Sequence, residues 1–427
     1  MIMIKKIKAG ALQFVLFIGV VVAILLMSFL LLTHTHKQFE DSATVLIAMI
    51  KQANMALDKS LQKSFEIGEE LIIKDENELD LPTAITRDYW GIFEKRTVIA
   101  KHATKEYTKI GLIGGCMFHK FVALYLSENK RPLILAGNAK ITGDAYVPAS
   151  GINTGSIYGN AYNLPRTLYG VQKESSPSLP NISEELKAQL ASMGRKYDLI
   201  GTEVVMESNA EIKNSFDLKT KVLSGREVVL NNTVLLGNIV IKAEHKIVVT
   251  SSAQLKDVLL IAPQIEIQDN VAGNFQAIAT TSIKVGRYCK LGYPTALVLN
   301  KKEQELEGYR NFKTSASASF SGIYIDQFSK ITGSVLSVNK NKSGKPEIAI
   351  EANAEVIGEI YCANSLELKG RVTGTVITNS FIAMENGNAY QNHLYNGRIN
   401  SEKLPKVFVG MLLSNREEHK KLMKWLY

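Results

Sequence analysis

Apolar residues are unevenly distributed along the chain, and their longest block lies near the amino terminus. From Phe14 to Leu32 the sequence reads FVLFIGVVVAILLMSFLLL, nineteen residues without a charged side chain. A helix needs about 20 apolar residues to cross the hydrocarbon core of a bilayer. We therefore predict a transmembrane helix over residues 11–33, preceded by a short basic leader over residues 1–10.

The residues that flank this block predict its orientation. Three lysines precede it within the first eight residues, whereas His34, His36 and Lys37 follow it. Lysine and arginine are enriched on the cytoplasmic side of membrane helices. An ordinary cleaved signal peptide has a shorter apolar core and then a small-residue cleavage site, and the flank LLLTHTHKQF contains no such site. We expect a single pass through the cytoplasmic (inner) membrane, with the amino terminus inside and most of the chain periplasmic or extracellular.

Residues 34–78 carry the apolar stripe of an amphipathic helix. Between Phe39 and Phe65 apolar residues recur at steps of three and four, and the first proline is Pro82. This spacing predicts a stalk helix. A single rod continuous with the membrane segment would span roughly 90 Å at a rise of 1.5 Å per residue. Two helices with a break near residues 33–37 are the alternative.

Beyond the stalk the pattern changes to short β-branched and aromatic runs. Residues 79–137 are β-rich, and the stretch SENKRP reads as a turn between two strands. A helical segment near residues 181–197 interrupts the later strands. It begins with Ser183 as N-cap and two acidic residues in its first turn. The linker-like SSPSLPN before it predicts that this helix loops out of the main body.

A short motif, apolar–x–Gly–x–apolar, recurs through the rest of the chain. Its glycines are Gly143, Gly159, Gly237, Gly273, Gly333, Gly358 and Gly374. The first two and the last two are each sixteen residues apart, and the step from Gly237 to Gly273 is thirty-six, or twice eighteen. A β-solenoid whose coils turn at glycine corners would have such a period. We predict a mainly β fold with a β-solenoid over residues 138–400; a β-sandwich or a pair of packed sheets is the alternative.

The last segment, residues 401–427, has the pattern of a cap. It reads as an apolar strand followed by a basic helix that ends in Trp425 and Tyr427. A cap would close the open end of a solenoid. The same helix could instead lie on a membrane surface.

Composition limits the class of protein. Of 427 residues 46% are hydrophobic and 21% charged, which permits a folded core and excludes a disordered chain. The net charge of +9 is spread without a long basic run. It predicts affinity for acidic surfaces, such as anionic lipid or a cell-wall or acidic glycan, and no specific nucleic-acid site.

Motifs of catalysis are scarce in the sequence. Neither a P-loop, nor G-x-S-x-G, nor H-E-x-x-H occurs. His34 and His36 lie at the predicted membrane edge, where an interfacial role is expected rather than metal binding. The isolated carboxylates that a β-helix hydrolase or lyase could use are Asp144, Asp257, Asp269 and Asp326. We therefore predict no catalytic residue, no cofactor and no metal.

The cysteines also lack a recognisable pattern. Cys116, Cys289 and Cys362 are widely spaced and form neither a CxxC nor a zinc motif. We interpret them as small buried apolar residues. One disulfide would be possible if two of them met in space.

The amino terminus resembles a known family. The start MIMIKKIKAG-ALQFVLFIGVVVAILL is similar to the leaders of type IV pilin-like proteins, above all minor pilins and pseudopilins: a short basic leader, a glycine, a small residue and a long apolar helix. The resemblance covers the first thirty or so residues. It implies cleavage by a prepilin peptidase between Gly10 and Ala11. The fifth residue of the mature chain, usually Glu in pilins, is Val15 here. A plain signal anchor is the alternative.

Residues 133–164 and 222–384 resemble bactofilin-like, polymer-forming β-helix domains, which are structural scaffolds. Together these features predict a non-enzymatic, single-pass membrane-anchored structural protein of a bacterial envelope, as a minor-pilin-like part of a type IV filament or secretion assembly. Its expected partners are the membrane and other envelope or filament proteins. A membrane-tethered bactofilin-like scaffold and a carbohydrate-active β-helix enzyme are the alternatives.

Overall fold

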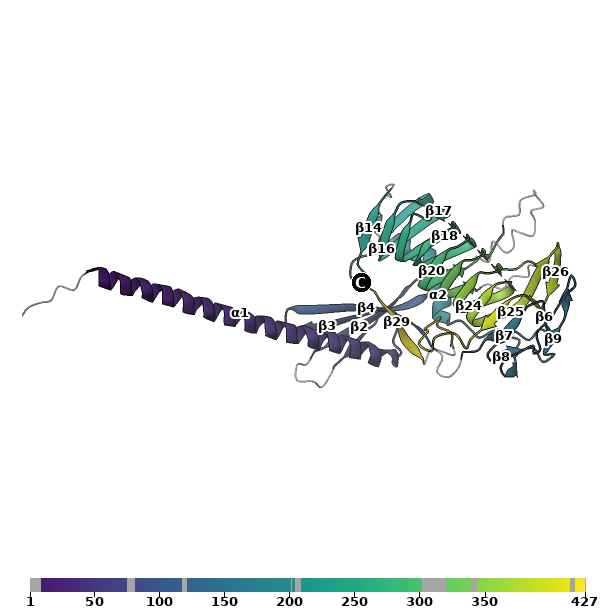
Figure 1. Cartoon of the computed structure of the whole chain (residues 1–427), viewed down its shortest axis with the longest axis horizontal. Coiled ribbons are helices and arrows are strands. Elements are labelled where there is room, and N and C mark those ends of the chain that lie inside the picture. Colours follow the sequence, from purple (N-terminus) through teal and green to yellow (C-terminus); the bar gives the residue numbers. More distant parts are fainter. Residues whose placement is uncertain are drawn as a thin grey trace, which may run out of the picture. The chain divides into compact units, whose positions relative to one another are not determined.

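The computed structural model describes residues 9–74, 81–116, 121–200, 202–203, 209–301, 320–338, 344–414 and 419–426. The fold is mainly β with one long helix at the amino terminus (Figure 1), which confirms the predicted class at that level. Most of the leader (residues 1–8) and Tyr427 lie outside the described residues. Two compact units make up the chain. The first comprises Met1–Leu57, Ile72–Ile85 and Val98–Thr108, and the second Asp58–Leu71, Thr86–Thr97 and Lys109–Tyr427.

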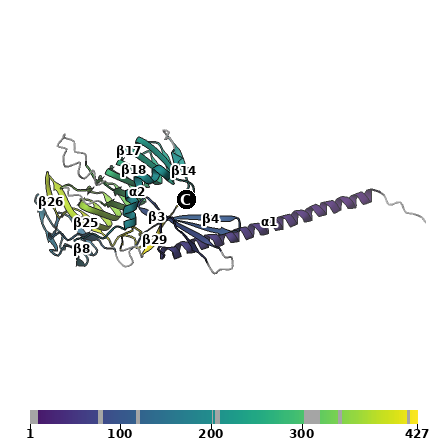
Figure 2. The same cartoon turned by 180° about the vertical axis from the view of Figure 1, so that it is seen from behind.

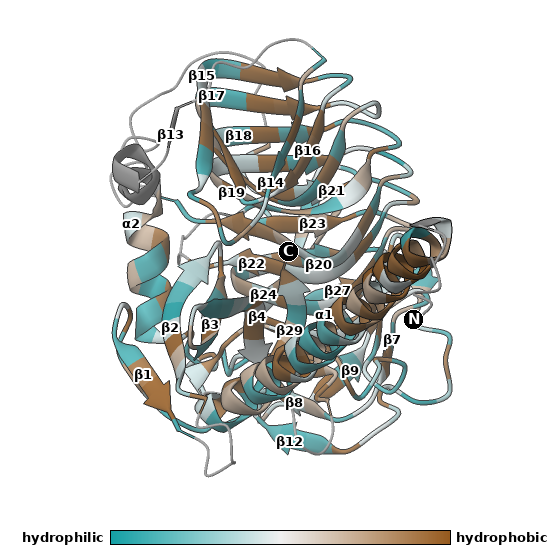
Figure 3. Cartoon of the chain, turned by 90° about the vertical axis from the view of Figure 1, so that its left-hand side faces the viewer, coloured by the Kyte–Doolittle hydropathy of each residue, from teal (hydrophilic) through white to brown (hydrophobic). Residues whose placement is uncertain are grey.

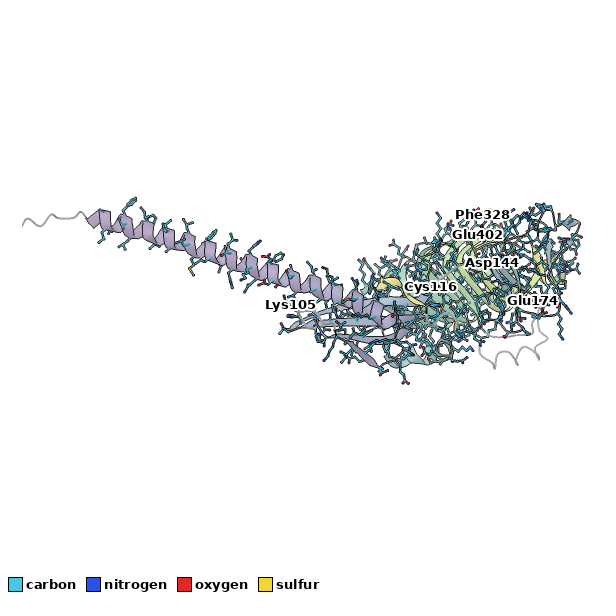
Figure 4. The ribbon with its side chains drawn as sticks, turned by 90° about the horizontal axis from the view of Figure 1, so that it is seen from below. Lys105, Cys116, Asp144, Glu174, Phe328 and Glu402 are labelled. Carbon is cyan, nitrogen blue, oxygen red and sulfur yellow. The ribbon has the colours of Figure 1, made fainter. Side chains whose placement is uncertain are left out.

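Helix α1 (Ala9–Leu61) is continuous over 53 residues. The alternative with a break near residues 33–37 is therefore wrong, and the helix ends at Leu61 rather than near residue 78. In the first unit Met49 packs with Leu81 and Ala100 in a small apolar core. The apolar residues from Leu12 to Leu32 have no such cover and are exposed. Figure 3 colours this half of α1 as hydrophobic, and Figure 4 shows its side chains standing free around the ribbon.

A five-stranded sheet has the order β1-β2-β3-β4-β29. Its strands are β1 (Glu70–Ile73), β2 (Thr83–Trp90), β3 (Phe93–His102), β4 (Lys105–Gly115) and β29 (Lys420–Leu426). The predicted basic helix at the carboxyl terminus is thus wrong, because this segment is a strand antiparallel to β4, with Lys420 opposite Gly115 and Leu426 opposite Ile110. Its local sequence favours a helix, but pairing with β4 supplies backbone partners that an isolated helical turn could not outweigh.

The second unit contains a large, closed, barrel-like sheet in which almost all neighbours are parallel. Its strands are β5 (Leu124–Leu126), β7 (Lys140–Thr142), β8 (Ala145–Val147), β12 (Gln172–Glu174), β13 (Thr202–Glu203), β14 (Glu211–Asn214), β15 (Lys221–Leu230), β16 (Val234–Gly237), β17 (Ile239–Val249), β18 (Gln254–Ile267), β19 (Ala272–Val285), β20 (Lys290–Leu299), β21 (Ile323–Ile325), β22 (Lys330–Ser337), β23 (Ile348–Ile350), β24 (Glu355–Leu368), β25 (Arg371–Glu385), β26 (Asn388–Gln391) and β28 (Arg398–Asn400). Two small groups flank it: β6 (Leu133–Ala136), β9 (Ile152–Thr154) and β27 (His393–Tyr395), and the hairpin of β10 (Ser156–Ile157) and β11 (Asn160–Ala161).

Each long strand bends and pairs in two places. Residues 272–279 of β19 pair with β20, whereas residues 283–285 pair with β21. Side chains alternate between an inner and an outer layer. The inner layer contains the register partners Val335, Ile360 and Val376, and the outer layer contains their neighbours Leu336, Tyr361 and Ile377. Parallel strands buried on both faces read as continuous apolar runs, which explains stretches such as VLLIA in β18. Figure 2 shows β18 beside its parallel neighbour β17.

Helix α2 (Glu184–Ile200) covers part of the outer layer. Ser183 Oγ accepts a hydrogen bond from the Leu186 backbone N–H at 3.2 Å, so the predicted N-cap is confirmed. Leu186, Leu190 and Met193 are buried in the outer apolar cluster. The prediction that this segment loops out of the main body is therefore wrong, because its apolar face covers the outer side of the parallel strands.

Candidate functional site

Three of the predicted repeat glycines occupy equivalent positions. Gly333 pairs with Gly358, and Gly358 pairs with Gly374, in neighbouring parallel strands. All three have positive φ, from 135° to 147°. A Cβ on Gly374 would lie 1.9 Å from the Gly358 carbonyl oxygen. The backbones are therefore stacked so closely at this bend that only glycine fits.

We call the in-register stack of Gly333, Gly358 and Gly374 the glycine column. The other four glycines do not all belong to it. Gly143 lies beside Ala123 and Ser401, and Gly237 pairs with Asn214 at the end of β16. Gly273 pairs with Leu255 and Leu291, both ordinary strand residues. Gly159 forms the turn of the β10–β11 hairpin. The sequence motif therefore grouped three glycines that stack in register with glycines in other surroundings.

Among the four candidate carboxylates, Asp257 has the most distinctive surroundings. Its backbone has a φ of 62°, and the strand register shifts there. Lys424 Nζ of β29 lies 2.5 Å and 2.7 Å from its two carboxylate oxygens. Asn274 Nδ2 donates to Oδ1 at 3.0 Å, and the Trp90 indole donates to the backbone carbonyl at 3.1 Å. The carboxylate is thus bound by groups of the chain itself.

The cavity beside Asp257 is small. Its lining includes Trp90, Asn274, Gln276 and Pro294, and its volume is about 10 Å³. This is room for about one water molecule. Gln276 binds the turn between β2 and β3, because Oε1 accepts from the Ile92 N–H and Nε2 donates to the Trp90 carbonyl, both at 2.9 Å. Asp257 and Gln276 therefore attach β29 and the β2–β3 turn to the parallel strands, and the cavity between them is too small for a substrate.

The remaining three carboxylates lie at turns. Asp144 accepts from the Val171 N–H at 3.1 Å, and Asp269 from the Arg287 N–H at 2.8 Å. Asp326 lies 3.4 Å from Arg287 Nε. No described group of three or more histidine, cysteine or acidic side chains could hold a metal ion. His34 and His36 lie on the exposed part of α1, and His34 contacts Gln38.

All three cysteines are unpaired and buried. Burial raises the pKa of Cys289. Burial, with the Glu347 carboxylate as a second cause, raises the pKa of Cys362 to about 12. Because the thiolate is the reactive form, these sulfurs should be inert.

This leads to a direct prediction. In the native protein a thiol reagent such as Ellman's should modify fewer than one cysteine per chain, whereas in denaturant it should modify all three. Absorbance at the end of the reaction gives the count. Rapid labelling of the native chain would contradict the buried positions.

A buried ion network that we did not predict from the sequence is centred on Glu94 of β3. Glu94 and Arg96 have fully buried side chains and lie 2.6 Å apart. Lys420 Nζ lies 2.8 Å, and Arg87 Nε 3.2 Å, from the other Glu94 oxygen. Arg96 also donates to Ser60 Oγ at 2.7 Å. Burial alone would raise the pKa of Glu94, but Arg96, Lys420 and Arg87 together outweigh it and lower that pKa.

The network extends to the protein surface. Arg87 donates to the Phe65 carbonyl at 2.6 Å and pairs with Glu185 of α2. A periodic signal in the sequence could have revealed these residues. In β3, Glu94 and Arg96 share the buried face with Val98 and Ala100, as strand alternation requires. The sequence signal for this network is therefore a charged pair, Glu94 and Arg96, in register with the apolar face of a strand.

A second buried carboxylate, Glu359, holds the segment before β29. Its side chain accepts from the Met411 N–H at 2.9 Å. Tyr293 OH donates to the Val409 carbonyl at 2.8 Å beside it. Glu359 directly follows Gly358 of the glycine column. The carboxylate at this bend therefore binds the backbone of the carboxyl-terminal segment at Met411.

The apolar half of α1 is the other candidate surface. This helix is long and apolar enough to cross a membrane, and none of the residues in its most apolar stretch is buried. Gly10 and Ala11 both lie in its first turns, and a Cβ on Gly10 would meet nothing within 4 Å. No protein-family model, curated protein or solved structure matches the chain.

Proposed function

We propose that the chain is a non-enzymatic, membrane-anchored structural protein of a bacterial envelope, and that it is a minor-pilin-like component of a type IV filament or secretion assembly. The observation that carries the proposal is the division of α1 into two halves. One half is apolar and uncovered, and the other packs in a core through Met49, which is almost fully buried. A continuous helix of this kind can remain in a bilayer or join a bundle of like helices while its other half holds a folded domain.

The exterior part is proposed to be a β-solenoid. This is supported by the parallel register of successive strands and by the stacked glycines at equivalent bends. Such a body offers a rigid surface for neighbours in an assembly. The proposal stays non-enzymatic because the four candidate carboxylates bind backbone or basic groups of the chain itself.

Processing of the leader tests the pilin-like part of this proposal. In cells that contain a prepilin peptidase, mass spectrometry of the purified protein should find a new amino terminus at Ala11. Gly10→Val should block cleavage. Gly19→Val is the matched control and should be processed normally, since a Cβ at either glycine meets nothing within 4 Å. An intact Met1 in the wild-type protein would overturn the pilin-like assignment.

A membrane-tethered bactofilin-like scaffold is the second candidate, favoured by the same in-register stack of parallel strands. The two candidates place the strands on opposite sides of the membrane. Alkaline phosphatase fused after residue 427 should be active for the envelope protein, and a fluorescent protein that matures only in the cytoplasm should stay dark. The opposite pair of results would favour the cytoplasmic scaffold.

A further inference from the structure

Two short hairpins of the second unit carry the same sequence and stand against each other. Residues 159–162 and 387–390 both read G-N-A-Y. The glycine of the first stretch lies in the turn between β10 and β11, and that of the second lies in the turn between β25 and β26. In each turn both central residues have positive φ: 47° and 78° at Tyr158 and Gly159, and 46° and 81° at Asn386 and Gly387. Both are therefore of the tight hairpin type that matches strand twist.

Side chains of the two hairpins and of β27 form one surface, which we call the tyrosine patch. Its members are Tyr158, Asn160, Asn388, Tyr390, His393 and Tyr395. Asn388 Nδ2 donates to Tyr158 OH, and Asn160 Nδ2 donates to Tyr395 OH at 2.9 Å. In Figure 1, β26 lies at the same end of the sheet as β6 and β9.

Tyr158 is the unusual residue of this surface. An aromatic residue with positive φ is strained, and Asn or Gly is preferred at such a turn position. The matching position of the twin hairpin is Asn386. The Tyr158 side chain is 51% exposed, so burial within the chain does not offset the strain. Tyr288 has a similar φ and exposure, but its ring is stacked on Phe328, whereas Tyr158 meets Tyr390 edge to face. A ligand stacked on the Tyr158 ring would account for tyrosine at this position.

The ring geometry leaves aromatic faces open. The Tyr158 and Tyr390 rings are 6.3 Å apart at 79°, and those of Tyr390 and His393 are 5.6 Å apart at 63°. Edge-to-face pairs of this kind cover less of each ring face than a parallel stack does. By contrast, Tyr288 and Phe328 on another bend are stacked at 5.1 Å and 6°. In the patch a flat apolar ligand face can therefore meet an open ring beside polar groups.

The six members of the patch carry phenols, amides and an imidazole. The nearby charged groups Glu385, the register partner of Asn388, and Lys369 are paired with each other at 3.0 Å. His393 Nδ1 lies 2.7 Å from the Gln391 carbonyl. Because a carbonyl only accepts, Nδ1 is the donor in this contact. Hydroxyl and amide groups both donate and accept. This combination matches an uncharged ligand with many hydroxyls and an apolar C–H face.

A protein partner fits this surface less well. A stable protein interface buries about 800 Å² on each side around an apolar centre. The six members of the patch are aromatic or amide residues and include no aliphatic side chain that could form such a centre. We propose that the tyrosine patch is a binding site for a neutral glycan, with a pyranose ring on the Tyr158 face and its hydroxyls bonded to Asn160, Asn388 and Tyr395. This inference does not rest on the proposed function.

The test uses the full-length chain in detergent micelles and three probes: the hexasaccharides of β-1,4-linked N-acetylglucosamine, β-1,4-linked glucose and α-1,4-linked glucose. Saturation-transfer NMR titrations measure binding. We expect at least one probe to bind at millimolar concentration. Tyr158→Asn should weaken that binding on the order of tenfold, because it copies the residue of the twin turn, keeps the hairpin and removes the ring.

Tyr288→Asn is the matched control. Tyr288 is also a tyrosine with positive φ, 59°, and is 53% exposed, but it lies outside the patch. Its variant should bind as the wild type does. Tyr395→Phe, which removes one hydroxyl and keeps the ring, should also weaken binding and does not touch either turn. Thermal melts of all variants establish that they fold.

Two outcomes would overturn the proposal. One is that none of the three probes binds the wild-type chain; a change of sedimentation in Tyr158→Asn would then indicate that the patch joins copies of the protein. The other is that Tyr158→Asn and Tyr395→Phe bind as tightly as the wild type while folded.

Discussion

Replacing Gly358 with alanine is expected to destabilise the second unit by roughly 3–5 kcal/mol, the sum of backbone strain and overpacking. The added Cβ would lie 2.0 Å from the Gly333 carbonyl oxygen and 2.8 Å from the Phe408 ring. The φ of 135° is also one that alanine rarely adopts. Backbone on both sides of the bend is held by parallel pairing, so neither neighbour can move away without breaking ladder hydrogen bonds.

Urea unfolding of the full chain in detergent measures this effect. Both tryptophans of the sequence, Trp90 and Trp425, lie in the second unit, so fluorescence reports its unfolding. Gly292→Ala in β20 is the matched control, since its Cβ would meet no atom closer than 3.7 Å. We expect that variant to change the free energy of unfolding by about 1 kcal/mol or less. Equal midpoints for the two variants would contradict the stacked-glycine interpretation.

The second large effect is expected for Glu94→Gln, which should lower the free energy of unfolding by about 3–5 kcal/mol. The substitution keeps the shape of the side chain but leaves Arg96 and Lys420, both close to Glu94, without their buried negative partner. Glu211→Gln is the control. The Glu211–Lys213 pair is largely exposed, and exposed pairs contribute little to stability because solvent screens them.

The same carboxylate predicts a pH dependence. Its pKa is lowered in the folded chain below the ordinary value of 4.5. A group with a depressed folded pKa contributes stability that is present above the unfolded pKa and is lost as pH falls through the folded one. The urea midpoint of the wild type should therefore fall as the pH is lowered below about 4.5, and less steeply in Glu94→Gln. Parallel pH profiles for the two proteins would show that Glu94 does not carry this dependence.

Several features could be predicted from local sequence because they need no distant partner. The uncharged run from Phe14 to Leu32 is apolar at every turn of a helix, which makes α1 long and apolar enough to cross a membrane. Ser183 caps α2 through a hydrogen bond to the Leu186 N–H, three residues away. The sixteen-residue step between Gly358 and Gly374 matches their pairing in register.

Other features depended on residues far apart in the chain. Residues 420–426 have the composition of a basic helix, yet β4, more than 300 positions earlier, pairs with them as a strand. Glu94 needs Lys420 and Ser60-bound Arg96 to be stable in the interior. The G-N-A-Y tetrapeptide occurs twice in the sequence, but the contact between the two hairpins through Tyr158 and Asn388 depends on how the strands stack.

Local sequence was sufficient to predict the long amino-terminal helix, the β-rich remainder, the capped α2 and the bends at Gly358 and Gly374, because hydrophobic period and glycine conformation act over a few residues. The folded chain was needed to see the strand at the carboxyl terminus, the burial of Glu94 and the meeting of the twin hairpins. These depend on which backbone edges and which charges meet in space, and short-range preference carries no information about such partners.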